Sequence, residues 1–434
     1  MMFLSPPRQI LKMLFAKTGR GLCACLIVSL ALMNSDFIGL SKAQATSKQE
    51  TAEVAAKVAY GAEFIREGEQ WKLVLKFDGK PETRVFLMDT PKRLVLELQD
   101  ALFNFKDALP DNAREAFQTI RYGAITSDKS RLVITLAKPL EIISKNLAHQ
   151  EGSSRYDLEI LLKPTSHEVF AAQISAQQAL LGSSGEAVVK GDRVRAGPRK
   201  EGHFSIVIDP GHGGIDGGSV GHETKVLEKD LTLKISNLIG EQIEGIGPFE
   251  VSYTRTEDVF VSLKERQQFA LRQNADLMIS IHADSLKQLF VRGATVYTLA
   301  KRATDALSQS IADSENLADV VAGLAAPEAQ DDVTDILADL TLRETTRFSR
   351  SFSSLLVENM RQEVKMIKNP QRAASFAVLK NAEVPSVLIE LGYLSNSEDE
   401  KLLSNDKWQA KAADLIARAV QQFFVNRTPH SQPD

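Results

Sequence analysis

Short apolar runs separated by turn residues dominate the chain from about residue 55 to residue 165. Runs of about four to eight residues with this alternation are typical of β-strands, and Asp78-Gly79 and Thr90-Pro91 are turn signals between them. We expect strands at residues 71–77, 83–88, 94–98, 132–136 and 156–162. The pattern therefore predicts a small all-β sandwich over residues 55–165.

The alternation changes twice after this region. Residues 166–202 are rich in Ser, Gly, Ala and Gln, which indicates a flexible linker, with a short helix possible at residues 169–181. From residue 203 on, apolar strands alternate with amphipathic helices. We expect strands at 204–209, 250–254, 277–282, 293–299 and 386–390, and helices at 231–243, 263–274 and 407–424. This order predicts an α/β domain over residues 203–427, with a largely parallel sheet and helices on both faces.

A long helical segment at about residues 303–368 interrupts this alternation. Residues 303–347 carry ten acidic and two basic side chains. Leu307, Ile311 and Leu324 recur near helical spacing, so we expect an amphipathic helical insertion rather than a disordered stretch.

The first 45 residues have the order of an export signal. Basic residues from Arg8 to Arg20 precede an apolar run at residues 22–33, and Ala43-Gln44-Ala45 fits a cleavage site. An amphipathic N-terminal helix is the alternative interpretation. The apolar run is too short for a convincing membrane span, and no later segment is longer and apolar, so we expect no integral membrane segment after cleavage.

Composition narrows the function classes. The chain has 434 residues, of which 43% are hydrophobic, enough for two globular domains. Its two cysteines, Cys23 and Cys25, lie in the apolar run, so a chain cleaved after Ala45 has no disulfide, thiol nucleophile or cysteine-bound metal. Cys25 is a poor lipoprotein site because most of the apolar run follows it. Residues 1–45 hold five basic and one acidic side chain, so the formal charge of −4 becomes −8 without them. This charge argues against a nucleic-acid partner.

Four residues suited to metal chemistry lie at predicted strand ends or at a helix start: His212, Glu228, His282 and Glu390. In an open α/β sheet, the ligand site lies at the carboxyl ends of the strands. Two imidazoles and a carboxylate can hold zinc and leave one position to water. A further carboxylate can move the proton. We therefore expect His212, Glu228 and His282 to bind a metal and Glu390 to act as acid and base.

Spacing alone leaves other interpretations open, because two histidines and one carboxylate with long spacers are weakly specific. His222 lies in the same loop as His212 and is a rival ligand. Glu228 also suits a helix N-terminus, where a carboxylate is favourable. Residues 217–221 match the serine-hydrolase pattern G-x-S-x-G, but a nucleophile elbow needs strand, turn and helix in immediate succession, and here the predicted helix begins near Lys229.

Five blocks in order carry a resemblance to a known family. They are Ile208-Asp209-Pro210-Gly211-His212-Gly213-Gly214, Glu228-Lys229-Asp230, Thr254-Arg255, Ser280-Ile281-His282-Ala283-Asp284 and residues 387–396. Over residues 203–425 the chain resembles the zinc-type N-acetylmuramoyl-L-alanine amidases of bacterial cell walls. The resemblance implies one Zn²⁺ per chain, held by His212, Glu228 and His282, with Glu390 as the catalytic acid and base. Asp284 stands where family members more often carry Asn, and we expect it to affect contacts around the ligands rather than metal binding.

The β-rich region resembles the AMIN domain that precedes many such amidases. Residues 91–98 and Ile120-Arg121-Tyr122-Gly123 carry this likeness. It implies a module that targets the enzyme to the cell wall, often at the division site.

The acidic insertion resembles the regulatory helix of the division amidases, with residues 314–319 as the best match. The resemblance implies that Glu315 reaches the zinc and blocks it, and that a LytM-domain activator relieves the block. Glu315 follows Ile311 by four residues, so the two share a helix face, although an ordinary solvated acid is the alternative. The family implies a periplasmic enzyme that acts on peptidoglycan during daughter-cell separation.

Two other functions remain open at the level of sequence. One is a wall-binding scaffold with an inert amidase domain, and the other is a zinc deacetylase that acts on wall sugars with the same ligands. Zinc content distinguishes the scaffold, and product analysis distinguishes the deacetylase.

Overall fold

The computed structural model describes residues 57–105, 109–126, 128–182, 202–324, 336–425 and 427. The expected export signal at residues 1–45 and parts of the expected linker and insertion lie outside these ranges. All of these described residues belong to one compact unit. Within the described ranges, we find no helix with the length and apolar character needed to cross a membrane.

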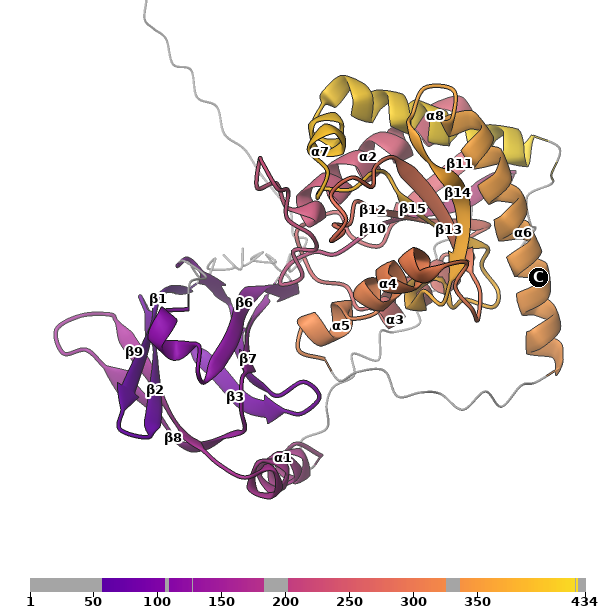
Figure 1. Cartoon of the computed structure of the whole chain (residues 1–434). Coiled ribbons are helices and arrows are strands. Elements are labelled where there is room, and N and C mark those ends of the chain that lie inside the picture. Colours follow the sequence, from indigo (N-terminus) through magenta and orange to yellow (C-terminus); the bar gives the residue numbers. More distant parts are fainter. Residues whose placement is uncertain are drawn as a thin grey trace, which may run out of the picture. The chain divides into compact units, whose positions relative to one another are not determined.

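The first part of the described chain is a β-sandwich (Figure 1). One sheet has the strand order β5-β1-β2-β9-β8 and the other has the order β3-β4-β7-β6. The strands are β1 (Lys57–Glu67), β2 (Gln70–Phe77), β3 (Glu82–Met88), β4 (Arg93–Gln99), β5 (Ala101–Phe103), β6 (Phe117–Thr126), β7 (Lys129–Leu136), β8 (Leu140–His149) and β9 (Tyr156–Pro164). The predicted sandwich is confirmed. The prediction missed β1, β5, β6 and β8. Strand β5 has only three residues, and most side chains of the other three strands are partly or fully exposed and leave no apolar alternation.

A helix completes the β-sandwich at its C-terminal side. Helix α1 (His167–Gly182) packs its Phe170 into the core between the sheets. The Gln177 side chain accepts a hydrogen bond from the backbone N–H of Leu87 at 2.9 Å. The stretch from residue 166, which the sequence suggested as a linker, therefore begins with a helix attached to the sandwich, because Phe170 is buried there.

The second part of the chain contains a six-stranded sheet with the order β11-β10-β12-β15-β13-β14. Its strands are β10 (Phe204–Pro210), β11 (Phe249–Tyr253), β12 (Leu277–His282), β13 (Ala294–Leu299), β14 (Met366–Ala374) and β15 (Ser386–Glu390). Neighbouring strands run parallel except β13 and β15, which are antiparallel. The predicted α/β fold with a largely parallel sheet is confirmed. The prediction missed β14, whose polar, partly exposed residues lack an apolar pattern.

Helices cover both faces of this sheet, as the sequence predicts (Figure 1). The helices are α2 (Glu228–Ile246), α3 (Leu263–Arg272), α4 (Ala306–Glu315), α5 (Ala318–Val321), α6 (Ile336–Met360), α7 (Ser397–Leu403) and α8 (Asp406–Phe424). Successive side chains of a strand point to opposite faces. Ile206 and Ile208 accordingly join the core beneath α2, α6 and α8, whereas Val207 joins the core beneath α3 and α4.

The insertion between β13 and β14 contains three described helices rather than one. Helix α4 ends at Glu315, and the short α5 follows after two residues. Ile311 of α4 is buried on one face of the sheet, whereas Phe352 and Leu356 of α6 are buried on the other. The insertion is therefore anchored by apolar packing at both of its ends.

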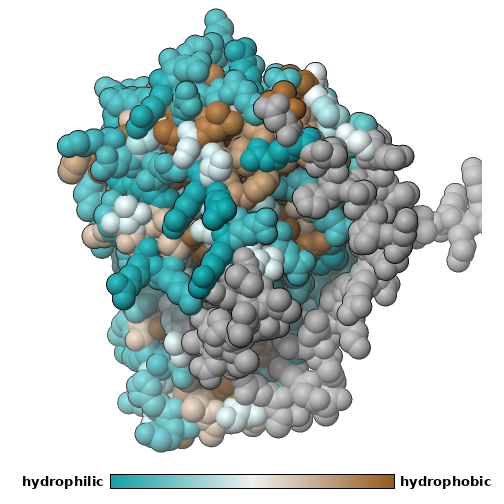
Figure 2. All heavy atoms as spheres, turned by 90° about the vertical axis from the view of Figure 1, so that its right-hand side faces the viewer, coloured by the Kyte–Doolittle hydropathy of each residue, from teal (hydrophilic) through white to brown (hydrophobic). Residues whose placement is uncertain are grey.

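Large apolar side chains on the surface are scattered among the described residues. Phe290 is 81% exposed and Leu289 is 55% exposed, and both lie in the loop after β12. The face in Figure 2 is mostly hydrophilic, with small apolar patches between polar residues. Isolated exposed apolar residues are normal on a protein surface.

Candidate functional site

The predicted site residues converge at one edge of the six-stranded sheet. His282 and Glu390 are the last residues of the neighbouring strands β12 and β15 and pair in register. His212 follows the end of β10, and Glu228 is the first residue of α2. The structure therefore brings together all four candidates, because the carboxyl ends of parallel strands meet at the same edge.

The loop after β10 holds His212 in an unusual backbone conformation, with φ at 60°. Two buried arginines fix this loop through its carbonyl oxygens: Arg255 donates to Gly211 at 2.9 Å and Arg266 donates to His212 at 2.7 Å. The Asp209 carboxylate forms an ion pair with Arg266, with 2.6 Å between Oδ1 and Nη1. These contacts keep the loop backbone in place, so the His212 ring has a defined position.

Four buried side chains form a compact cluster: His212, Glu228, His282 and Glu315. Each offers one potential metal-binding atom, and these atoms all lie within 4.8 Å of one another. His212 Nε2 is 3.2 Å from Glu228 Oε1, and His282 Nδ1 is 3.4 Å from the same oxygen. Glu315 Oε2 lies 3.0 Å from His282 Nδ1 and 3.6 Å from His212 Nε2. The insertion thus delivers a carboxylate to the three candidate ligands.

The chemistry of this donor set fits a divalent cation. His212 Nε2 and His282 Nδ1 are buried and lack a hydrogen-bond partner within the described chain. Burial alone would lower the pKa of His282, but the carboxylates of Glu315 and Glu228 raise it to about 10. The pKa of His212 is likewise raised well above its usual value, against burial, by Asp216, Glu228 and Glu315. These rings lie in a strongly negative environment, and a zinc ion accepts such nitrogen and oxygen donors.

A further set of contacts orients the candidate ligands. His212 Nδ1 lies 2.8 Å from Asp216 Oδ2, on the side of the ring away from Glu228. The two oxygens of Glu228 accept the backbone N–H groups of Ala283 and Ser219, both at 2.8 Å. Sequence reasoning missed Asp216; the available signal is an acid four residues after His212 in the same loop. A carboxylate at this position fixes the imidazole tautomer and orientation.

Glu390 lies beside the cluster and is fully buried. Its Oε2 accepts the backbone N–H of Asp284 at 3.0 Å, and its Oε1 has no hydrogen-bond partner in the described structure. Burial raises the pKa of Glu390 well above its usual value; His282 opposes this shift, and Asp284 and Glu228 add to it. A carboxyl group with a raised pKa can exchange a proton near neutral pH.

Asp284 lies next to Glu390, to which it donates its backbone N–H. Its Oδ1 accepts the Ser219 hydroxyl at 2.8 Å. Burial, together with Glu315 and Glu228, raises the pKa of Asp284 to about 7. The side chain is therefore close enough to interact electrostatically with the candidate site, although it is not among the clustered ligand atoms.

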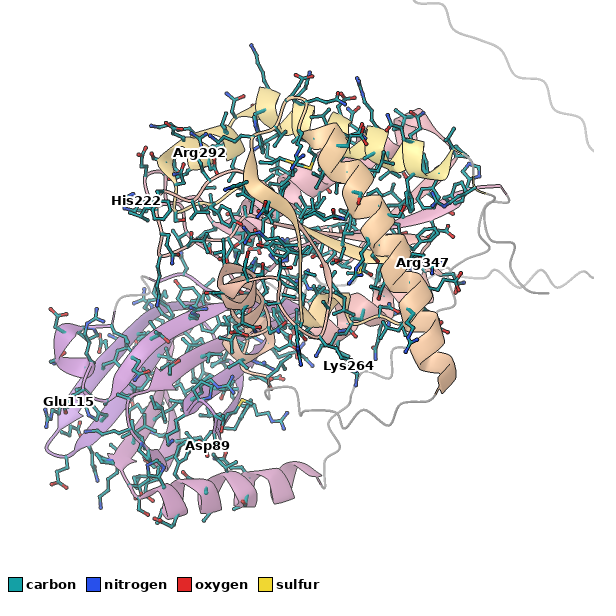
Figure 3. All side chains as sticks on the ribbon, turned by 45° about the vertical axis from the view of Figure 1, so that its right-hand side comes forward. Asp89, Glu115, His222, Lys264, Arg292 and Arg347 are labelled. Carbon is teal, nitrogen blue, oxygen red and sulfur yellow. The ribbon has the colours of Figure 1, made fainter. Side chains whose placement is uncertain are left out.

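The structure disfavours the rival interpretations of this loop. His222 is exposed and lies outside the clustered group, and Figure 3 shows it at the periphery of the domain. Ser219 lies in the loop between β10 and α2, nine residues after the end of β10 and nine before the start of α2, and its hydroxyl donates to Asp284. It therefore lacks the strand, tight turn and helix of a nucleophile elbow.

Comparison with known proteins identifies the family. Residues 206–422 match the family described as N-acetylmuramoyl-L-alanine amidase, and residues 61–158 match the AMIN domain. The amidase AmiC of Neisseria meningitidis is 30% identical over 81% of this chain and 86% of its own length. The chain belongs to the N-acetylmuramoyl-L-alanine amidase family. Family membership supports peptidoglycan amidase activity, in a chain that joins an AMIN domain to the amidase domain.

Other relatives match about half of this chain or most of it. AmiC of an Escherichia coli O6:H1 strain is 28% identical over 89% of this chain and 93% of its own length. AmiA of Escherichia coli K12 is 34% identical over 52% of this chain and 79% of its own length. The solved structure of the amidase AmiC2 of Nostoc punctiforme is 26% identical, covers 52% of this chain and 100% of its own, and has a TM-score of 0.38.

Proposed function

We propose that this chain is a zinc-dependent N-acetylmuramoyl-L-alanine amidase, which hydrolyses the amide bond between N-acetylmuramic acid and the L-alanine of the stem peptide. The observation that carries the proposal is the buried cluster of His212, Glu228 and His282 beside the buried Glu390. His212 Nε2, His282 Nδ1 and a Glu228 oxygen would hold one zinc ion, which polarises a carbonyl and lowers the pKa of water.

The residues of the chain divide the proton chemistry among them. Glu390 takes a proton from the attacking water as its oxygen adds to the lactyl carbonyl carbon. Glu390 then gives this proton to the L-alanine nitrogen, so that the carbon–nitrogen bond breaks and the stem peptide leaves with a free amine. The Asp284 backbone N–H holds Glu390 through Oε2 and leaves Oε1 available for the proton.

We also propose that Glu315 inhibits the enzyme. Glu315 is 5% exposed, and its carboxylate lies 3.0 Å from His282 Nδ1 and 3.6 Å from His212 Nε2, so it would compete with water for a metal held by these rings. Activity then requires the end of α4 to move away, a shift between two states. We infer that the enzyme is exported to the periplasm, acts in daughter-cell separation, and is opened by a LytM-domain partner, as the family resemblance implies.

Mass spectrometry of the products from purified peptidoglycan tests the proposed reaction. The protein without its export signal is incubated with and without a chelator. Free stem peptides that appear only without chelator support the amidase. Loss of acetyl groups from the sugars, with the stem peptides still attached, would instead indicate a deacetylase. Bound zinc without any product, also from the Glu315→Gln variant, would indicate a scaffold.

We expect Asp216→Ala to weaken zinc binding about 10- to 100-fold, because His212 loses the carboxylate that orients its ring. The affinity is measured by competition with a chromogenic chelator, so that the result does not depend on catalysis. His222→Ala is the matched control, since His222 is exposed in the same loop. Equal zinc affinities of the Asp216 variant and the unmodified protein would show that this contact does not support the metal site.

We expect Gly211→Ala to impair the same site by a different route. A Cβ atom at Gly211 would lie 2.5 Å from Cε1 and 2.6 Å from Nε2 of His282, so the ring has to move. We expect at least about a tenfold loss of zinc affinity, since ligand geometry is set by such packing. Gly245→Ala is the control, because a Cβ atom there meets no atom within 4 Å. Full zinc affinity in Gly211→Ala would contradict the position of His282.

A further inference from the structure

The regulatory segment, defined here as residues 306–324, is bound to the amidase domain at the turn between α4 and α5 and again within α5. The Asn316 side chain donates to the Ser375 carbonyl at 2.9 Å and accepts the Ala377 N–H at 2.7 Å. Asp319 accepts the backbone N–H of Leu263, the first residue of α3, at 2.9 Å. These contacts follow Glu315 directly and therefore fix its backbone.

A second set of contacts comes from the β-sandwich, which belongs to the same compact unit. Arg93 of β4 donates hydrogen bonds to the carbonyl oxygens of Val320 and Leu324. The Leu324 oxygen lies 3.3 Å from both Nη1 and Nη2 of Arg93. Arg131 of β7 donates to the carbonyl oxygen of Ala322 at 2.6 Å. The two arginines thus bind three carbonyl groups at the C-terminal end of the regulatory segment, of which that of Val320 also accepts the Gly323 N–H at 3.0 Å.

Apolar packing accompanies these hydrogen bonds. Val95 and Val133 pair across β4 and β7 and form a buried cluster with Ala322. Ile215 and Phe260 of the amidase domain complete this cluster. Because strand side chains alternate between faces, these valines and the two arginines share the outer face of their sheet, opposite the sandwich core.

The shape of the segment matches this face. Gly323 has φ at 75°, and a Cβ atom there would lie 3.0 Å from a methyl carbon of Val133 and 3.4 Å from Cδ of Arg131. The backbone can approach the valine this closely because the residue has no side chain. Arg93 is only 1% exposed, and a guanidinium group that is buried this deeply needs hydrogen-bond acceptors. The regulatory segment supplies them.

We propose that the AMIN domain holds the regulatory segment closed, with Arg93 and Arg131 binding the backbone carbonyls of Val320, Ala322 and Leu324. This inference rests on the proposed inhibitory role of Glu315. The AMIN domain then has a role besides targeting, because its contact with the regulatory segment favours the closed state. The carbonyls that the two arginines bind lie only five to nine residues after Glu315, so a change on the outer face of β4 and β7 would alter the position of Glu315 in the active site.

The test uses the full chain without its export signal and a soluble muramoyl peptide as substrate, so that wall binding does not contribute. Arg93→Met and Arg131→Met remove the donors and keep most of the apolar stem. Gly323→Val disturbs the contact from the segment side and leaves the sandwich unaltered. Arg121→Met is the matched control: Arg121 lies on β6 of the same sheet, opposite Val133 of β7, and is exposed. Each variant is prepared with Glu315 and with Glu315→Gln.

We expect the Arg93, Arg131 and Gly323 variants to raise the hydrolysis rate about tenfold when Glu315 is present and to have no further effect in the Glu315→Gln background. Hydrogen exchange of the amides at residues 311–324 should be faster in the same three variants and unchanged in Arg121→Met. Zinc content should be equal in all of them.

The possible outcomes distinguish the role of the AMIN contact from the inhibitory role of Glu315. If Glu315→Gln raises the rate but the three contact variants raise neither the rate nor the exchange, the AMIN contact does not hold the segment, and the role of Glu315 stands. If Glu315→Gln leaves the rate unchanged, the inhibitory role itself is wrong, and the inference falls with it. A rate increase of equal size in both Glu315 backgrounds would also overturn the inference, since the arginines would then act by another route.

Discussion

Glu390→Gln should reduce the hydrolysis of peptidoglycan by about 10²- to 10⁴-fold, with one zinc ion per chain still bound. The amide has nearly the shape of the carboxylate but cannot take a proton from water. Glu390 is buried beside the cluster without belonging to it, so the variant should leave the metal site intact. The measurement is the release of stem peptides by liquid chromatography, with zinc determined on the same sample by atomic spectrometry.

His282→Ala is the informative partner of this variant, since His282 is the in-register neighbour of Glu390 and belongs to the cluster. It should lose both zinc and activity, whereas Glu390→Gln should lose only activity. A Glu390→Gln enzyme that retains its rate would remove Glu390 from the reaction. A Glu390→Gln protein without zinc would instead assign Glu390 to metal binding.

Glu315→Gln should have the opposite effect and raise the rate of the isolated enzyme about 10- to 100-fold. The variant removes the negative charge that lies 3.0 Å from His282 Nδ1, so the side chain at position 315 competes less well with water for the metal, although the segment keeps its other contacts. A tenfold change in rate needs only a tenfold change in the equilibrium constant between the closed and open states, which is about 1.4 kcal/mol of free energy. Initial rates on a soluble muramoyl peptide, at saturating zinc, provide the measurement.

Asp313→Asn is the control for this experiment, because Asp313 is an exposed acid on the same helix α4, and its carboxylate accepts a hydrogen bond from the Gln309 side chain at 2.7 Å. It should leave the rate unchanged. Equal activation by both variants would point to the overall charge of α4 rather than to Glu315. A decrease with Glu315→Gln would indicate that the glutamate takes part in catalysis.

The structure shows why the core of the site could be predicted from the sequence. His282 and Glu390 end apolar strand runs, and in a parallel sheet such ends lie at one edge whatever the length of chain between them. The period of two along β10 also sorts its side chains to the two faces correctly. These features depend on local patterns, which a single sequence displays.

Other features depend on contacts between distant residues and could not be predicted. Arg93 binds the carbonyl of Val320, 227 residues away, and nothing near Arg93 in the sequence indicates that it becomes buried. Asp216 is close to His212 in sequence, but its contact depends on a loop in which His212 has a positive φ. The division of the insertion into separate helices likewise depends on where Asn316 and Asp319 find partners.

The regulatory segment, residues 306–324, lies in the chain between β13 and α6, both of which are packed into the core of the amidase domain, and it carries Glu315. A carboxylate attached to the chain in this way acts at an effective concentration, on the order of millimolar for a short tether. Inhibition by Glu315 would therefore be independent of dilution and of the amount of enzyme made. A partner that opens the segment would need to outcompete only an intramolecular contact. The enzyme would be inhibited again as soon as that partner dissociated.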